Sequence, residues 1–253
     1  MIIKVGCCGF SRSKKEYFKN FSLIELQSTF YDLPKNIETV KKWREEAPKD
    51  FEFSLKAWQV ITHEISSPTY KRMKTKFGNV KNYGNFKNSK EVFEAWERIR
   101  EIAKILKSKV IVFQCSPSFN QTNENIKNIK GFFTSIERNN LLFALEIRGK
   151  WDEKVLKEIC EEFNLVHCVD PFKQKSVYGN INYFRLHGKN GYNLRYIYTK
   201  KDFDEILSFC TRKENYVLFN NIEMYSNALQ LKSYIIKYSD RPKSKLTSSL
   251  NSN

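Results

Sequence analysis

The sequence predicts an α/β protein in which strands and helices alternate within one domain. Short runs rich in Val, Ile, Leu and Phe recur along the 253 residues, and each is followed by polar residues or by Gly and Pro. The segments between these runs carry the helical spacing of apolar side chains. The unit repeats about eight times, and at this chain length such repetition favours closure into a single (β/α)8 barrel of the TIM type.

The predicted strands are short and apolar. They cover residues 2–8, 23–29, 51–57, 110–115, 142–147, 165–170, 183–187 and 216–219. A doubly wound open sheet is the alternative architecture, and it usually brings a Gly-rich turn after the first strand. No G-x-G-x-x-G stands there, because Gly6 and Gly9 flank two cysteines. A dinucleotide site is therefore not expected.

The predicted helices follow from apolar spacings of three and four residues. One stripe comprises Val92, Trp96, Ile99, Ala103 and Leu106. Apolar residues recur at every fourth position in residues 151–163. Thr199 and Asp202 form a capping-box pattern, which predicts a helix from there to about residue 211. Residues 226–236 are predicted to form the closing helix, whereas residues 171–182 are too few for a full helix between the sixth and seventh strands.

Two segments interrupt the alternation. Residues 66–90 contain no acidic residue, and Tyr and Phe residues are interleaved with their basic ones. We interpret this segment as a loop-rich basic insertion between the third and fourth strands. From residue 239 onward Arg and Lys give way to Ser and Asn, which predicts a disordered basic tail over 239–253. The barrel domain is then expected to cover 1–238.

Charge is the compositional outlier. Lys and Arg number 44 against 28 Asp and Glu, so the formal net charge is +16 and the pI is near 9.5. This balance favours polyanionic partners such as nucleic acid, or anionic substrates. A Lys-rich composition spread over a solvated surface explains it equally well. The oligomeric state stays open.

The six cysteines lack metal-binding spacing, with no C-x-x-C among them. Most stand in apolar runs, which indicates buried thiols of a reducing compartment. No apolar stretch has the length of a membrane span, and the first ten residues lack the long apolar stretch of a signal peptide. We therefore expect a cytoplasmic protein with no membrane contact.

Polar residues stand where the predicted strands end, which is where a barrel enzyme places its chemistry. They are Glu25, Thr29, Lys56, His63, Gln114, Glu146, Arg148, Asp170, Arg185, His187, Asn220 and Asn221. Singly, each has a structural explanation, such as an ion pair between Glu146 and Arg148 or a satisfied interior His187. Together they predict one pocket, because each unpaired buried ion costs several kcal/mol.

The same strand ends carry ordered sequence motifs. Residues 24–34 read IELQSTFYDLP, and FSLKA, ITH, RLHG and FNN follow at residues 53–57, 61–63, 185–188 and 219–221. In these motifs the chain resembles the domain-of-unknown-function family 72, the YecE-like family, from Val5 to about Leu231. The resemblance implies a TIM-type barrel with a polar pocket. It adds Tyr31, which lies within the first of these motifs, to the candidate residues of the pocket. It implies no reaction. One departure is Gly149, where the family often has His.

One hypothesis is an enzyme, a hydrolase or lyase, acting on a phosphorylated or otherwise anionic small molecule. Lys56, Arg148 and Arg185 would hold the anion. Glu25, Glu146 or Asp170 would serve as general base and His187 as general acid. The other ligand contacts would come from Thr29, Tyr31, His63, Gln114, Asn220 and Asn221.

A divalent metal is a variant of this hypothesis. Glu25, Glu146, Asp170 and His187 are ligand types that suit Mg, Mn or Zn. The chain holds only three histidines, too few for a multi-zinc site, so no metal ligand is assigned and the cofactor stays open.

The alternative hypothesis is nucleic-acid binding without catalysis. Basic residues interleaved with aromatic ones suit phosphate contacts and base stacking. The candidates in residues 71–90 are Lys71, Arg72, Lys74, Lys76 and Lys81. A solvated Lys-rich loop explains them as well. A third hypothesis is a small-molecule sensor or scaffold that has lost catalysis, which only Gly149 supports.

Overall fold

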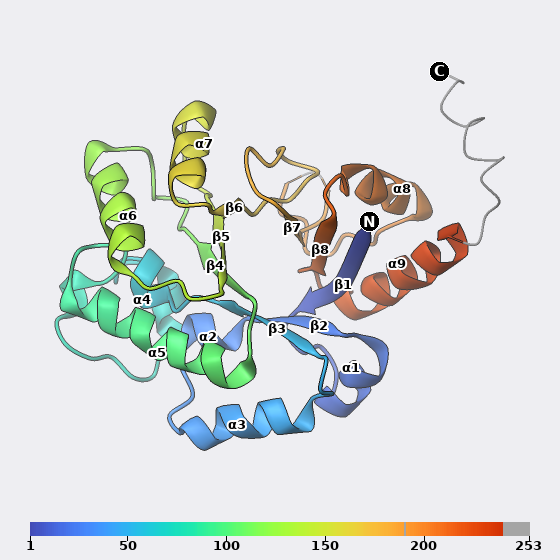
Figure 1. The fold of residues 1–253 in the computed structure, drawn as a ribbon, viewed down its shortest axis with the longest axis horizontal. Helices are drawn as coiled ribbons and strands as arrows, with labels where there is room; N and C mark the ends of the chain where they lie inside the picture. The colour runs from blue at the N-terminus through green and yellow to red at the C-terminus, as the bar shows by residue number, and fades with distance from the viewer. Residues whose placement is uncertain (190, 240–253) are drawn as a thin grey trace.

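Eight parallel strands form one sheet that nearly closes into a barrel (Figure 1), in a computed structural model that describes residues 1–189 and 191–239. The strands are β1 (Ile2–Cys8), β2 (Leu23–Leu26), β3 (Glu52–Lys56), β4 (Val110–Gln114), β5 (Leu142–Glu146), β6 (Val166–His167), β7 (Asn182–Leu186) and β8 (Glu214–Phe219). They are ordered β6-β5-β4-β3-β2-β1-β8-β7. A parallel bridge between Val169 and Phe184 links the two end strands. The predicted TIM-type barrel is confirmed, and the open-sheet alternative is wrong.

Helices follow most strands and cover the outside of the sheet. They are α1 (Lys14–Asn20), α2 (Ser28–Tyr31), α3 (Ile37–Glu46), α4 (Gln59–Thr62), α5 (Lys90–Leu106), α6 (Asn123–Ser135), α7 (Glu153–Glu162), α8 (Lys200–Phe209) and α9 (Met224–Ser239), with short 3-10 turns η1 (Pro68–Arg72) and η2 (Val80–Asn82). The predicted stripe lies buried on α5, and the capping box of Thr199 and Asp202 begins α8. Residues 168–181, all described, contain no helix, as expected.

The second and sixth strands are shorter than predicted. β2 ends at Leu26 because the chain turns into α2, where the Thr29 hydroxyl donates to the carbonyls of Leu26 (3.0 Å) and Lys56 (2.8 Å). The hydroxyl thus satisfies backbone acceptors at the end of the strand. Past β6 the chain stays extended, and the backbone N–H of Arg185 donates to the carbonyl of Val169 at 2.9 Å.

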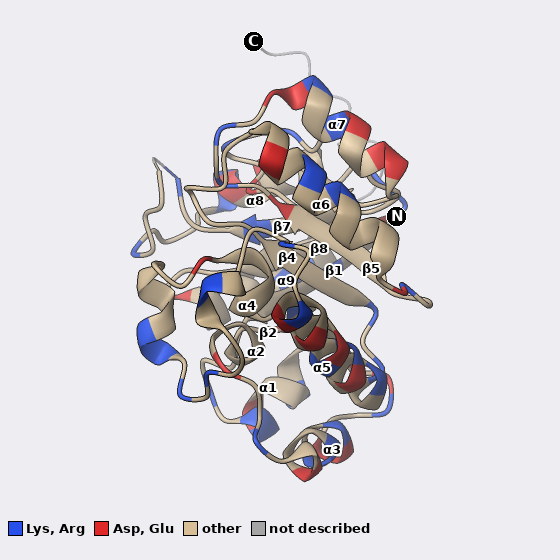
Figure 2. Cartoon of the chain, turned by 90° about the vertical axis from the view of Figure 1, so that its left-hand side faces the viewer, with Lys and Arg blue, Asp and Glu red and all other residues tan. Residues whose placement is uncertain are grey.

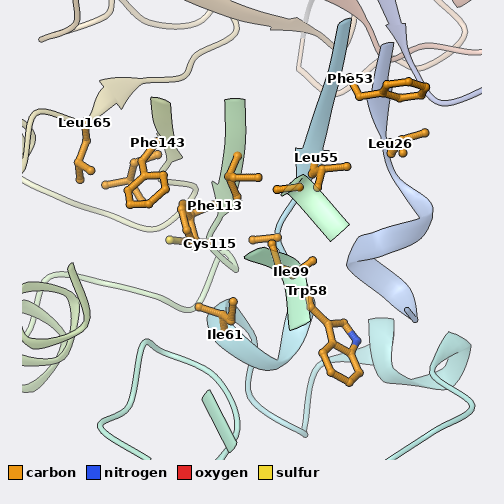
Figure 3. Close-up of a cluster of buried hydrophobic side chains, with 14 of the residues drawn as sticks. Leu26, Phe53, Leu55, Trp58, Ile61, Ile99, Phe113, Cys115, Phe143 and Leu165 are labelled. Carbon is orange, nitrogen blue, oxygen red and sulfur yellow. The ribbon is translucent and has the colours of Figure 1, made fainter. Parts of the chain in front are cut away.

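Side chains alternate between the two faces of each strand. On the outer face, Leu55, Phe113 and Phe143 pack with Ile99 of α5 in a buried apolar layer (Figure 3). A separate buried cluster includes Val112, Ala144, Cys168, Tyr183 and Leu218. The next residue on the same face, two positions on, is polar in each case: Gln114, Glu146, Asp170, Arg185 and Asn220. The alternation therefore brings these polar side chains to one end of the barrel.

The basic insertion lies in the connection from β3 to β4, between α4 and α5, and contains η1 and η2. Its aromatic residues belong to the core: Tyr70, Tyr83 and Phe86 are buried, and Phe77 stacks on Trp58 with ring centroids 5.3 Å apart. Its cationic side chains are exposed at Lys71, Arg72, Lys74, Lys76 and Lys81. The segment is thus loop-rich, as predicted, and anchored by its aromatic side chains.

Other sequence expectations have mixed outcomes. All six cysteines are free and buried, as predicted. No helix in the described part of the chain combines the length and apolarity needed to cross a membrane. Basic and acidic residues are interleaved on α5 and α7 (Figure 2). The disordered tail was predicted over 239–253: Ser239 is instead the last residue of α9, and residues 240–253 lie outside the described residues.

Candidate functional site

Arg185 of β7 is the centre of a buried charge network. Its side chain is 0% exposed. Its Nε lies 3.1 and 3.2 Å from the two carboxylate oxygens of Glu25, and its Nη1 donates to Gln114 at 3.0 Å and to Glu146. Gln114 and Glu146 are register partners on β4 and β5. A guanidinium enclosed by two carboxylates and an amide holds three strand ends in a fixed relation.

Glu146 also binds a second arginine. Arg148 donates from Nε to Glu146 at 2.6 Å. Burial alone would raise the pKa of Glu146, but the charges of Arg185 and Arg148 outweigh it and hold that pKa well below its usual range. Glu146 is therefore an ionised carboxylate. The Arg148 side chain is 21% exposed, and among the described residues its Nη1 has no hydrogen-bond partner.

Glu25 is fully buried and has further donors besides Arg185. The Tyr183 hydroxyl donates to it at 3.0 Å, and the Gln27 amide donates at 2.6 Å. Both carboxylate oxygens are thus occupied. Glu25 therefore holds Arg185, Tyr183 and Gln27 in place from the end of β2.

His187 follows β7, and both of its ring nitrogens lie close to polar side chains. Its Nε2 lies 3.2 Å from Nη2 of Arg148 and 3.0 Å from Nδ2 of Asn220. Because a guanidinium can only donate, Nε2 is an acceptor and the ring proton sits on Nδ1. That nitrogen faces Asp170, 3.4 Å from its Oδ2. Burial lowers the pKa of His187, with Asp170 opposing the shift, so the ring is neutral at pH 7.

Lys56 ends β3 and is 4% exposed. Its Nζ lies 3.5 Å from the ring centroid of Phe30, and no described residue gives it a hydrogen bond or an ion pair. Burial lowers the pKa of Lys56 well below its usual value, and the charges of Arg185 and Arg148 lower it further. On the same Phe30 ring lies His63, 4.9 Å between centroids. Burial and the Lys56 charge lower the pKa of His63 to about 3.

Three predicted ligand-binding residues have other contacts. Thr29 binds backbone carbonyls, as described above. The Asn221 amide donates to the Tyr196 carbonyl and the Asn227 side chain, both at 2.8 Å, and so joins β8 to α9. Tyr31 is half-buried under Arg72, whose guanidinium carbon lies 3.6 Å from the ring centroid. These three are not part of the Arg185 network.

The sequence reasoning did not assign several residues that the structure adds to the site. Tyr183 stands two positions before Arg185 on one strand, so the alternation of strand faces could have found it. Tyr192 has no such signal, because it comes from the loop before α8. Its ring lies 5.0 Å from the ring of His187 and 3.3 Å from Nζ of Lys173. Tyr192 is 56% exposed and forms the rim.

Glu25, Glu146, Asp170 and His187, the four residues of metal-ligand type, do not form a shared ion site among the described residues. In residues 1–189 and 191–239, no group of three or more His, Cys, Asp and Glu side chains is placed to hold a metal ion. The Arg185 guanidinium binds both Glu25 and Glu146 and takes the place that a cation would fill. The donor set therefore does not fit a resident divalent metal.

Gly149 lies at a close approach of two backbone segments. A Cβ at this position would stand 2.1 Å from the carbonyl oxygen of Phe119. The chain has no room there for the histidine that the family motif often carries.

The sequence matches the family described as "Protein of unknown function DUF72" over residues 11–250. The chain belongs to the DUF72 family. A curated relative, the UPF0759 protein YunF of Bacillus subtilis, is 24% identical over 242 residues, which is 81% of this chain and 79% of YunF. The comparison confirms the resemblance inferred from the motifs at the strand ends.

Solved structures of DUF72 proteins have the same fold. That from Enterococcus faecalis aligns with a TM-score of 0.72 at 23% identity, over 93% of this chain and 98% of its own. The DUF72 protein from Thermotoga maritima aligns with a TM-score of 0.70 at 20% identity, over 93% of this chain and 100% of its own. Two further solved structures share the barrel at the level of fold. A D-tagatose 3-epimerase-like protein aligns with a TM-score of 0.56 at 18% identity, over 95% of this chain and 97% of its own. Endonuclease IV of Thermus thermophilus aligns with a TM-score of 0.55 at 10% identity, over 92% of this chain and 99% of its own.

Proposed function

We propose that this DUF72 protein is an enzyme, a hydrolase or lyase, that binds a phosphorylated or otherwise anionic small molecule at the carboxyl ends of its strands. The observation that carries the proposal is the pairing at His187. The Nε2 lone pair of the neutral ring accepts from Arg148 and Asn220. When these two donors turn to the negative group of a bound ligand, the lone pair is released and can take a proton from that ligand.

The anion contact is assigned to Arg148. Its Nη1 has no partner among the described residues, and its side chain keeps 21% exposure. Arg185 is enclosed, and its donors go to Glu25, Gln114 and Glu146. We therefore give Arg185 a positioning role, although it was a candidate anion ligand on sequence grounds. Lys173 at the rim adds positive charge.

The base is assigned to His187, which the sequence-based hypothesis gave as the general acid, and not to one of the carboxylates. The pKa of Glu146 is lowered by its arginine partners, so it is a poor base near neutral pH, and both oxygens of Glu25 are occupied by protein donors. His187 is neutral, because burial lowers its pKa. Asp170 faces the Nδ1 proton and stabilises the imidazolium that forms when Nε2 accepts a proton.

The proposal is tested by binding and exchange measurements on a panel of sugar phosphates and phosphorylated hydroxy acids. Calorimetry with Arg148→Gln is expected to lose roughly tenfold or more in affinity, and Lys150→Gln is the matched control for an exposed charge nearby. His187→Asn should retain binding and lose roughly 10²–10⁴-fold in phosphate release or in solvent deuterium exchange at carbon. Equal affinity of Arg148→Gln and wild type for every anion would contradict the assignment.

Nucleic-acid binding through the insertion is the second candidate. It is favoured by the exposure of Lys71, Arg72, Lys74, Lys76 and Lys81. The burial of Tyr70, Tyr83 and Phe86 opposes it, since those rings cannot stack on bases. Binding to single-stranded RNA that weakens steeply with salt, and that is lost when Lys74 and Lys76 become Gln, would support it.

A further inference from the structure

Lys56 is a buried ionisable group at this end of the barrel that the proposed base and anion contacts leave unused. Its side chain is 4% exposed and ends over the face of Phe30. In the described chain no carboxylate lies within ion-pair distance of Nζ and no acceptor within hydrogen-bond distance. A lysine this deeply buried ordinarily has a counterion.

The amino group is enclosed by the protein yet still accessible to a small reactant. The residue keeps 4% exposure, and a ligand at this end of the barrel would reach Nζ through that opening. Burial and the charges of Arg185 and Arg148 favour the neutral amine over the ammonium ion, and they outweigh the opposing attraction of the Phe30 ring face and of the Glu146 and Glu25 charges. A desolvated lysine next to other cationic groups is the form in which proteins use this side chain as a nucleophile.

We propose that Lys56 forms an imine with the carbonyl carbon of an anionic aldehyde or ketone, so that the substrate class of this site is small carbonyl compounds that carry phosphate or carboxylate. The anionic part of this statement rests on the proposed function, because it needs Arg148 as the anion contact. The covalent part rests on Lys56 alone.

The step balances without a further reactant. The amine lone pair attacks the carbonyl carbon, a C–N bond forms, and the C=O π pair moves to oxygen, which takes a proton. The nitrogen loses a proton, the hydroxyl leaves as water after a second protonation, and the nitrogen lone pair completes the C=N bond. Within this proposal the proton transfers are assigned to His63, a neutral imidazole that contacts the same Phe30 ring.

The protonated imine then acts as an electron sink for the neighbouring carbon. Withdrawal of electrons into the C=N bond acidifies a C–H or weakens a C–C bond one carbon away. His187 is the base assigned to this end of the barrel. Of the two reaction types kept open above, this inference selects the lyase.

The experiment is reductive trapping on the wild-type protein at pH 7 with dihydroxyacetone phosphate and sodium cyanoborohydride, followed by intact mass and peptide mapping. The expected adduct has the mass of the ketone plus two hydrogens less one water, on Lys56. Lys81, exposed in the insertion, is the internal control. Burial favours the neutral, nucleophilic form of Lys56, so Lys56 should be labelled roughly tenfold faster or more than this exposed lysine.

The arms of the experiment separate the two proposals. If dihydroxyacetone phosphate is trapped on Lys56 faster than dihydroxyacetone, and Arg148→Gln abolishes this preference, the result supports both the imine on Lys56 and the anion contact of Arg148. Equal trapping by the two ketones supports the imine and removes the anion contact. Labelling of Lys56 no faster than Lys81, with calorimetric binding of the phosphate intact, overturns the imine and leaves the proposed function standing.

Discussion

Replacing Glu146 with Gln tests the buried charge network most directly. Glu146 accepts from Arg185 and from Arg148, and a neutral amide leaves both guanidinium groups with one carboxylate, Glu25, between them. Removing one partner of a buried ion pair costs roughly 3–5 kcal/mol. That is a large part of a total stability of about 5–15 kcal/mol. For a domain of this size it corresponds to a fall in Tm of roughly 6–20 °C.

The effect of Glu146→Gln depends on pH with a definite sign. The pKa of Glu146 in the folded protein lies well below its usual range, and in the unfolded chain it is about 4.3. A group whose folded pKa is depressed stabilises the fold above its unfolded pKa and loses that contribution as the pH falls towards the folded pKa. The difference between wild type and variant should shrink below about pH 4.3, by up to about 1.4 kcal/mol per pH unit.

Urea unfolding followed by circular dichroism measures both effects, at pH 7 and at several values between pH 5 and 3. Glu137→Gln is the matched control, because Glu137 pairs with Arg100 at a side chain that is 76% exposed, and exposed pairs contribute little. A loss of under about 1 kcal/mol at pH 7, or a difference that is constant down to pH 3, would refute the reasoning.

Three further substitutions test other contacts. Gly149→Ala should destabilise the protein by roughly 1–3 kcal/mol in urea, because its Cβ would meet the Phe119 carbonyl at 2.1 Å; unchanged stability would contradict that close approach. Thr29→Val should cost about 1 kcal/mol by losing the bonds to the Leu26 and Lys56 carbonyls, with sugar phosphate affinity unchanged. A loss of affinity at full stability would return Thr29 to the binding site. Lys56→Met should raise the stability by roughly 1–3 kcal/mol, because it removes a buried amine without a partner; a lower Tm would show that the amine stabilises the fold.

Local pattern explains why the sequence predicted which polar residues lie together at one end of the barrel. The period of two along a strand carries the inward face from Val112 to Gln114 and from Ala144 to Glu146. Any parallel barrel brings such positions to one end. The prediction was wrong where a local interaction competed with strand pairing, as at Thr29, whose hydroxyl satisfies two carbonyls and ends β2 in a helical turn.

The sequence by itself determined the alternation of strands and helices, the barrel, and which polar residues stand at the carboxyl ends of the strands. These properties depend on residue spacing and on neighbours a few positions away. Only the tertiary structure decided how those residues pair. Glu25 and Arg185 are 160 positions apart and Arg148 and His187 are 39 apart, so no local pattern encodes their contacts. That pairing is what ties the carboxylates to arginines, puts the His187 proton on Nδ1, and leaves Lys56 as a buried amine with no partner among the described residues.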